Sequence, residues 1–248
     1  MKKFLLGICI IIFLFGACSQ KEAVPAAIEN PFFSEFDTPF GTVPFERIKT
    51  EHFLPAFEKA IQIQKKEIQE IAESEEEPTF ANTILALEYS GELLTKVSNV
   101  FFSLLGANTN DEMQKIARDN APVLAKHQDD ILLNEALFAR IKSVYDRREE
   151  WDLNAEEARL LEHFYKLFVR GGANLKDEDK ARFREINEEL SILSVQFNEN
   201  ILKEDNRFEM VIDNEADLDG LPEAVISGAR EAAEAKGHSG KWLFTLQK

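Results

Sequence analysis

The sequence has few residues of the kinds that bind transition metals. It contains four histidines, His52, His127, His163 and His238, and no two of them lie three to five positions apart. A His-x-x-x-His pair places two imidazoles on one face of a helix, which is the usual start of a helical zinc site. The lack of such a pair excludes a zinc site of this type from the 248 residues.

Cysteine is equally scarce, because Cys9 and Cys18 are the whole supply. Residues 2–3 are lysines, residues 4–15 form an almost unbroken apolar run, and a Gly-Ala pair directly precedes Cys18. This order is typical of a signal peptide and resembles a bacterial lipoprotein signal, in which the cysteine is lipidated and becomes the mature N-terminus. We predict a lipoprotein-type signal at residues 1–18, with Cys18 as the lipidation site. A secretory signal with an incidental cysteine is the alternative.

The signal determines where the mature chain resides and how it is held together. Its apolar run is too short to cross a bilayer as a helix, which needs about 20 residues. Cleavage removes Cys9 and acylation blocks Cys18, so no disulfide can form within the mature chain. We expect a protein of the bacterial cell envelope, lipid-anchored at the outer membrane or on the periplasmic side, and stabilised by packing alone.

Basic residues are outnumbered in this chain. There are 29 Lys and Arg residues against 45 Asp and Glu residues, for a formal net charge of −16. Nucleic acids and anionic membrane surfaces bind proteins through Lys and Arg, so this balance excludes nucleic acid as a partner. The acidity accounts for solubility, and attraction of cationic substrates is the alternative. Hydrophobic residues make up 44% of the chain, which is enough for a folded core.

No independent active site can be recognised. No Ser, Cys or Thr nucleophile stands with a base placed to activate it. Arg170-Gly171-Gly172 lacks the Gly-Lys-Ser/Thr ending of a phosphate-binding loop, so we interpret it as the C-terminal cap of a helix. The acidic cluster Glu73–Glu77 could bind calcium weakly, but a solvated loop is the simpler interpretation.

The histidines have structural interpretations. We expect His52 and His163 to be partly buried structural residues, His127 to lie on a solvated helix face, and His238 to be an exposed turn residue. Glu162 precedes His163 directly, and helix neighbours one position apart point about 100° away from each other. This pair therefore does not predict a metal site.

Proline separates the signal from the first helical pattern. Residues 19–45 contain four prolines, and proline fixes φ and lacks an N–H, so we predict a tether and an extended arm. The arm carries Phe32, Phe33, Phe36, Phe40 and Phe45. Exposure of so many aromatic side chains would be costly in water, so we expect the arm to lie against the body.

Apolar residues recur with helical spacing from residue 46 to residue 205. We predict helices that start at Thr50, Thr79, Asn110, about Leu137 (to Tyr145), Asn154 and Asp177. The Glu73–Glu77 cluster should end the first helix, and the second should continue to about Gly106. Pro122 should kink or split the third helix.

The last of these helices, Glu178–Lys203, carries a regular apolar stripe. The stripe consists of Phe183, Ile186, Leu190, Leu193, Phe197 and Ile201. Its steps of three and four residues are typical of a helix packed lengthwise on a partner. We predict that the stripe is buried in an antiparallel hairpin. Asn187, Asn198 and Asn200 lie off the stripe, where they could form hydrogen bonds between helices.

The pattern changes at residue 206. Alternate residues from Phe208 to Ile212 are apolar, as in a strand, and Leu221–Lys236 predicts a helix. Trp242–Leu246 predicts a second strand with nothing to pair against. We therefore expect residues 206–248 to be the beginning of a truncated strand–helix–strand unit. The predicted fold class is mainly α, with long antiparallel helices followed by the start of a small α/β unit.

Several segments resemble one family of zinc peptidases, in family order. They are Asn30–Phe32, Thr38–Gly41, Pro44–Phe57, Pro78–Thr83, Phe168–Leu175, Ile186–Asn200 and Trp242–Leu246. The family includes oligopeptidase A, thimet oligopeptidase and peptidyl-dipeptidase, and the resemblance is closest to the bacterial peptidyl-dipeptidases. Together the segments cover nearly all of the mature chain, which resembles the N-terminal part of such an enzyme.

The resemblance implies a two-lobed, mainly helical peptidase with a deep channel that admits short peptides. In the family a His-Glu-x-x-His helix and a later Glu hold zinc, and the first Glu acts as general base on a metal-bound water. All these residues lie downstream of the matched region. No catalytic, cofactor-binding or metal-binding residue can therefore be named here, and zinc is expected in the complete family protein but not in this chain.

Two functional hypotheses result. In the first, the chain is the N-terminal, substrate-restricting lobe of a zinc metallopeptidase that hydrolyses short peptides, truncated at Lys248 and inactive alone. In the second, the chain is a self-sufficient acidic helical lipoprotein that binds peptides or a protein partner and catalyses nothing.

Overall fold

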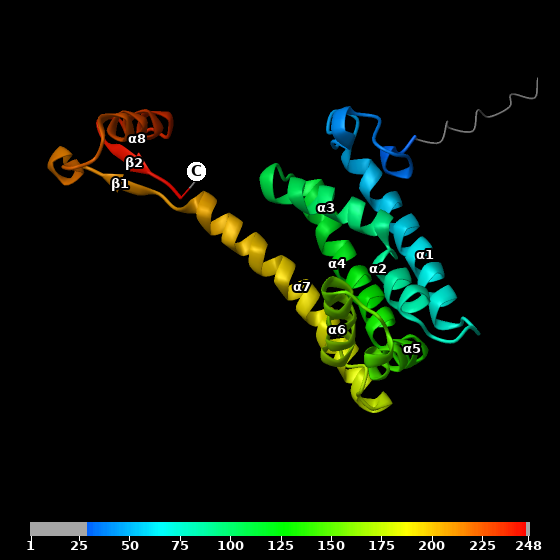
Figure 1. Ribbon diagram of the computed structural model, residues 1–248. Coiled ribbons are helices and arrows are strands. Elements are labelled where there is room, and N and C mark those ends of the chain that lie inside the picture. Colours follow the sequence, from blue (N-terminus) through cyan, green and yellow to red (C-terminus); the bar gives the residue numbers. More distant parts are fainter. Residues whose placement is uncertain (1–28, 247–248) are drawn as a thin grey trace, which may run out of the picture.

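The computed structural model describes residues 29–246 and is mainly helical within that range (Figure 1). Its α-helices are α1 (Phe53–Ala72), α2 (Ala86–Glu88), α3 (Glu92–Ala107), α4 (Asp111–Leu132), α5 (Glu135–Asp146), α6 (Ala155–Arg170), α7 (Asp177–Arg207) and α8 (Glu223–Ala235). Its strands are β1 (Met210–Ile212) and β2 (Trp242–Phe244). The predicted fold class is confirmed, whereas the predicted signal peptide and Cys18 lie outside the described residues.

The elements form two parts that α7 joins. Helices α1 to α6 make up a helical body, and β1, α8 and β2 make up a C-terminal unit at the far end of α7 (Figure 1). Helix α7 has 31 residues, so it is about 46 Å long at 1.5 Å per residue. It packs mainly on α4, not on the preceding helix α6 as the predicted antiparallel hairpin requires.

Short polar side chains begin three helical segments where the sequence predicts. Asn110 accepts a hydrogen bond from the backbone N–H three residues later at 2.9 Å and starts α4. Asn154 starts α6 in the same way at 3.0 Å. Thr79 does so at 3.1 Å for a π-helical turn, Phe80–Leu85. Each cap satisfies N–H groups that have no partner within the first turn.

Three features of the predicted helices are wrong. The second predicted helix is divided at Gly91, whose φ of 73° is readily adopted only by glycine. The Gly91 N–H donates to Glu67 on α1 at 2.8 Å, which fixes the position of the break. Helix α4 continues through Pro122 as one helix, so the predicted split does not occur. Thr50 does not cap α1, because it lies inside a 3₁₀ turn that precedes that helix.

Two hydrophobic clusters stabilise the helical body. The first, here the aromatic core, comprises Phe32, Phe53, Ala56, Phe57, Val97, Val100, Phe101, Met113 and Ala117. The second, here the lower core, lies among the end of α1, the π-helical turn, α5 and α6, and includes Ile84, Leu137, Ile141, Val144, Leu161 and Phe168. These side chains come from helical faces at the spacing that an amphipathic helix presents to a core.

The N-terminal arm lies against the body, as predicted, but only part of its aromatic surface is buried. The Phe32 ring is 1% exposed and lies 5.4 Å from the Phe53 ring, measured between ring centroids. The Asn30 side chain donates to the His52 carbonyl at 2.8 Å, which ties the arm to the start of α1. Phe33, Phe40 and Phe45 remain exposed.

The C-terminal unit is a strand pair covered by a helix. Strands β1 and β2 are antiparallel, with Val211 opposite Leu243. The prediction that the last strand has no partner is therefore wrong. Leu218, Ala229 and Trp242 form a small core of their own between this ribbon and α8.

Candidate functional site

Polar side chains join α7 to α4 of the helical body. The Asn187 side chain on α7 donates to Asp129 on α4 at 2.7 Å, which confirms the predicted interhelical role of this asparagine. Next to it, Arg184 pairs with Asp130 at 2.8 Å. These bonds hold α7 against α4 by specific polar contacts.

A further ion pair extends this junction towards the C-terminal unit. Arg118 on α4 pairs with Glu199 on α7, about 22 Å along the helix from Arg184 at 1.5 Å per residue. Asn198 and Asn200, the other two asparagines predicted to bridge helices, are exposed. The hydrogen-bonding prediction is thus supported for one asparagine of three.

Burial shapes the electrostatics at this junction. Burial raises the pKa of Asp129 above its ordinary value, although Asn187 and Arg184 act in the opposite direction. Burial also acts to raise the pKa of Asp130, but the charges and hydrogen bonds of Lys126 and Arg184 outweigh it and lower that pKa. The Asp130 carboxyl is therefore held as the anion more strongly than the Asp129 carboxyl.

His127 lies two residues before Asp129 on α4. Its side chain is 3% exposed and its Nε2 is 2.8 Å from Gln64 Oε1 on α1. The prediction of a solvated histidine is wrong because this face of α4 is turned towards α1. Burial lowers the pKa of His127 below its ordinary 6.5, and the nearby Lys65 charge adds to the effect.

Acidification is expected to destabilise the protein through His127. The folded chain holds this imidazole neutral, while the unfolded chain protonates it as the pH falls through 6.5. The unfolded state then binds more protons, so the free energy of unfolding falls with pH in this window. His127→Gln should flatten that dependence between about pH 7.5 and about pH 5.5 in urea unfolding experiments. His163→Gln, at an exposed site, is the control for the substitution itself.

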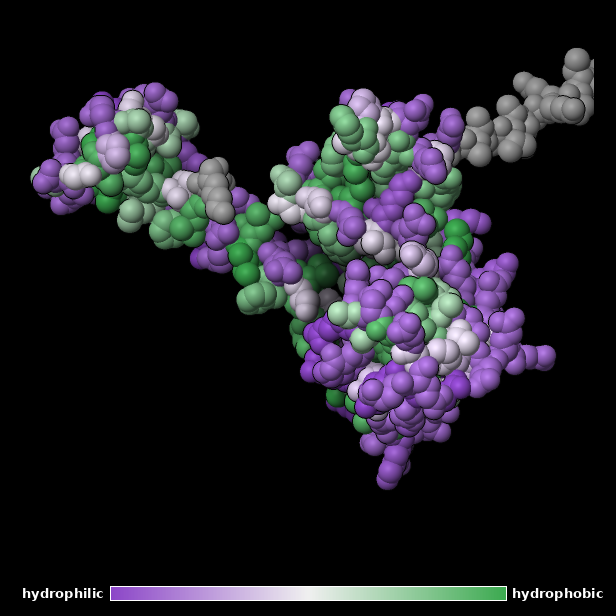
Figure 2. Space-filling model, viewed as in Figure 1, coloured by the Kyte–Doolittle hydropathy of each residue, from purple (hydrophilic) through white to green (hydrophobic). Residues whose placement is uncertain are grey.

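An apolar groove lies between α3, α4 and α7. It has a volume of about 390 Å³. Its apolar lining includes Phe102, Leu105, Ala117, Val195 and Leu202. At its edge the buried hydroxyl of Thr109 has no hydrogen-bond partner. Figure 2 shows the hollow between α7 and the helical body, with hydrophobic side chains at its base. Gln114, Asn198 and Glu199 also line the groove, which therefore has the composition of a binding site for an apolar group with a few polar contacts.

Sequence patterns did not single out this groove. Val195 and Leu202 are seven residues apart on α7, so they share a helical face. The apolar stripe from Phe183 to Ile201 lies on another side of α7 and is the more regular signal in the sequence. Phe102 is next to the buried Phe101 and points towards the groove side instead of the core. The groove exists because three helices that are distant in sequence meet there.

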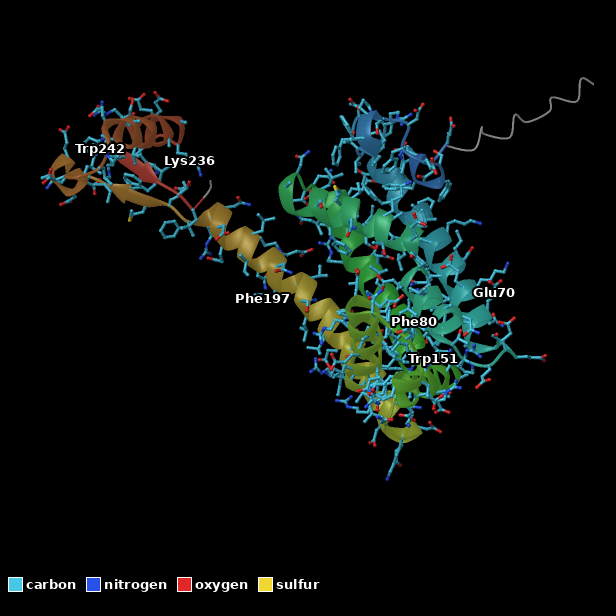
Figure 3. All side chains as sticks on the ribbon, viewed as in Figure 1. Glu70, Phe80, Trp151, Phe197, Lys236 and Trp242 are labelled. Atoms are coloured by element: carbon cyan, nitrogen blue, oxygen red, sulfur yellow. The ribbon has the colours of Figure 1, made fainter. Side chains whose placement is uncertain are left out.

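The regular stripe on α7 is exposed to solvent. We call Ile186, Leu190, Leu193, Phe197 and Ile201 the α7 seam; their exposed fractions are 39%, 53%, 49%, 65% and 44%. Helix α7 has no buried residue, so the prediction that the stripe is buried is wrong. Figure 3 labels Phe197 on the part of α7 that leads towards the C-terminal unit.

The other predicted site residues keep structural roles. His52 is 5% exposed and its Nδ1 accepts from the Lys49 N–H at 3.1 Å, as expected of a structural histidine. His163 is exposed, which corrects the prediction of partial burial. His238 lies in a turn as predicted but is half-buried instead of exposed, with Nε2 3.8 Å from a Glu209 oxygen. Arg170 ends α6, and Gly172 has a φ of 94°, as predicted for a helix terminus.

The acidic residues between α1 and the π-helical turn form a solvated loop, as expected, but its backbone is fixed. Arg140 on α5 is 7% exposed. Its guanidinium donates to the carbonyls of Ser74 and Glu76 at 2.8 and 2.9 Å, and to the Asn82 side chain at 3.2 Å. Arg147 also donates to the Pro78 carbonyl at 2.8 Å, so two arginines fix the path of the loop backbone.

Known peptidases are similar to this chain over most of its length. It is 42% identical over 217 residues to the dipeptidyl carboxypeptidase of Escherichia coli K12, a match that covers 88% of this chain and 32% of that protein. It is 30% identical over 207 residues to oligopeptidase A of Haemophilus influenzae Rd, covering 84% and 30%. The chain is homologous to these peptidases. The organellar oligopeptidase A of Arabidopsis thaliana is 28% identical over 223 residues, covering 88% and 28%.

These matches cover most of this chain but only part of each relative. The chain spans about a third of the length of the curated peptidases that it matches. No protein-family model matches it. The homology therefore supports a peptidase-family region, and the activity of a whole enzyme is a matter for proposal.

The side chains of the described residues do not fit the zinc that the peptidase resemblance implies. Within residues 29–246, no group of three or more His, Cys, Asp or Glu side chains could hold a metal ion. His127 and Asp129 lie near each other on α4, but they bond to Gln64 and Asn187 instead of facing a common point. No catalytic step can be derived from these side chains. No helix in the described range is long and apolar enough to span a membrane.

Proposed function

We propose that this chain is the N-terminal, substrate-restricting lobe of a zinc metallopeptidase that hydrolyses short peptides, as a peptidyl-dipeptidase or an oligopeptidase. The observation that carries the proposal is the 42% identity to a dipeptidyl carboxypeptidase over 88% of the chain. In this proposal the zinc ligands and the general base come from another part of the same polypeptide, and the present chain is inactive alone.

The role of this lobe is to restrict access to the reaction centre. Helices are rigid elements, and a wall built from them limits the size of the peptide that can pass. The groove between α3, α4 and α7 would receive an apolar side chain of the substrate, since its base is lined by Leu105, Ala117 and Val195. The acidic surface would favour peptides with basic residues.

The proposal includes a lipid anchor. Cys18 follows the small Gly-Ala pair of the signal, and its acylation would hold the peptidase at the bacterial cell envelope, at the outer membrane or on the periplasmic side. Mass spectrometry of the mature N-terminal peptide tests this point directly. An unmodified Cys18, or cleavage at another bond, would contradict the anchor while leaving the peptidase assignment intact.

The complete gene product is expected to bind zinc and to cleave internally quenched short peptides, whereas the 248-residue chain alone should do neither. The reason is that the chain supplies no metal-binding group in the described range. Metal analysis and fluorescence release from the same preparations measure both properties. A complete gene product with neither zinc nor cleavage would refute the proposal, and cleavage by the pure 248-residue chain would refute its inactivity.

A second candidate function is peptide or protein binding without catalysis, by an acidic helical lipoprotein. The groove favours it, because the groove combines apolar walls with the unpartnered hydroxyl of Thr109. The reading frame of the source DNA past Lys248 discriminates between the two. A frame that encodes His-Glu-x-x-His supports the peptidase, while a true stop codon together with a native protein of about 28 kDa supports the binding protein.

A further inference from the structure

We propose that the α7 seam is a docking surface for an α-helix from the part of the peptidase polypeptide that lies outside these 248 residues. The inference rests on the proposed function, because it names the partner of the same lobe. Its starting point is the seam itself, in which five apolar side chains between 39% and 65% exposed follow one another along α7.

The spacing of the seam specifies a helical partner. Its residues recur at intervals of three and four, the arrangement into which the side chains of a second helix fit lengthwise. From Ile186 to Ile201 the seam extends about 22 Å at 1.5 Å per residue. A continuous stripe of this length matches about four turns of a partner helix and exceeds the reach of a single loop.

No described element of this chain occupies the seam. Helix α7 contacts α4 through Arg184, Asn187 and Glu199. At about 100° per residue, these positions lie between roughly a quarter of a turn and nearly half a turn away from the centre of the seam. The two sides of α7 are therefore distinct, and packing on α4 leaves the seam uncovered.

Charge favours a segment of the same polypeptide over a second copy of this chain. Two copies would each bring a formal net charge of −16, and like charges across an interface oppose association. Glu185 and Glu189 lie on one flank of the seam, where a second copy would add more acidic residues. The fitting partner is an apolar helical face flanked by Lys or Arg.

The relatives are much longer than the region that this chain matches, so the rest of such a polypeptide would supply the docking helix. The matched region is 32% of the E. coli dipeptidyl carboxypeptidase and 30% of the H. influenzae oligopeptidase A. In a peptidase of that length, about two thirds of the polypeptide is available to cover α7. Covalent continuity would also raise the effective concentration of the docking helix.

Neighbouring positions on α7 allow a matched test of this docking. Leu193 lies in the seam and Ile192 lies on another side of the helix, and they are 49% and 38% exposed. We would introduce one thiol at a time by Leu193→Cys or Ile192→Cys. Rates of alkylation by iodoacetamide, measured by mass spectrometry of the modified peptide, then report the accessibility of each side.

The docking proposal predicts different alkylation rates in the 248-residue chain and in the complete gene product. In the 248-residue chain the two thiols should react at similar rates. In the complete gene product the thiol from Leu193→Cys should react at least about tenfold more slowly than the thiol from Ile192→Cys. Leu190→Cys, a second seam position, should repeat the result and guards against a disturbance specific to residue 193.

Two outcomes would overturn the docking proposal. Equal rates in the complete gene product would show that nothing covers the seam. Slow alkylation of the Leu193→Cys thiol already in the 248-residue chain, relieved by dilution, would identify a second copy as the occupant.

Zinc content and peptide cleavage of the unsubstituted gene product are measured separately. A protected seam in an inactive protein would refute only the proposed function, and an exposed seam in an active enzyme would refute only the docking.

Discussion

Replacing Phe101 with alanine is expected to lower the free energy of unfolding of the helical body by about 3–5 kcal/mol. Phe101 is fully buried in the aromatic core, with ring centroids 5.0 Å from Phe53 and 5.4 Å from Phe57. The substitution removes these contacts and leaves a cavity that close-packed neighbours fill only in part. A loss of this size is a large share of the stability of a typical domain.

The adjacent residue provides the control for this prediction. Phe102 is 48% exposed and touches the Phe101 ring at its edge, with centroids 5.2 Å apart. Phe102→Ala should cost less than about 1 kcal/mol, because about half of its surface is already in water. Urea unfolding followed by circular dichroism measures both variants. Equal losses at the two positions would contradict the proposed location of the core.

The second large effect is expected at Arg140. Arg140→Met should lower the free energy of unfolding by roughly 2–4 kcal/mol, because it removes charge-assisted hydrogen bonds to two backbone carbonyls and one side chain. Methionine retains much of the aliphatic length, so the change isolates the guanidinium. The loop that carries Ser74 and Glu76 loses its anchor. It should therefore become more sensitive to limited proteolysis than the rest of the body.

Arg148→Met is the matched control for this change. The Arg148 side chain is 48% exposed and donates to the Tyr145 carbonyl at 3.1 Å. Its removal should change stability by less than about 0.5 kcal/mol. If Arg140→Met leaves both the unfolding midpoint and the protease sensitivity of the loop unchanged, the loop is held by other contacts.

Local signals predicted the helix starts well. Asn110 and Asn154 cap α4 and α6 because a short polar side chain satisfies the first N–H groups wherever the following residues favour a helix. The glycine pair that ends α6 is equally local. These features depend on a few consecutive residues, so the sequence contains all the information needed to predict them.

Features that depend on distant elements were not predictable in this way. His127 was expected in solvent because polar neighbours surround it in sequence, yet Gln64 on α1 covers it. The division at Gly91 depends on Glu67, which is 24 residues away. The heptad rhythm of the α7 seam correctly identified an apolar face, but spacing alone cannot say which element covers that face.

The two tryptophans of the chain lie in different parts of the molecule. Trp151 packs against the lower core of the helical body, whereas Trp242 lies in the small core of the C-terminal unit. Indole emission responds to local solvent exposure, so each tryptophan is a natural fluorophore for one part. A ribbon of two three-residue strands has little cooperative stability of its own. Heating should therefore give two emission transitions, the Trp242 signal changing first, and calorimetry should depart from a two-state profile.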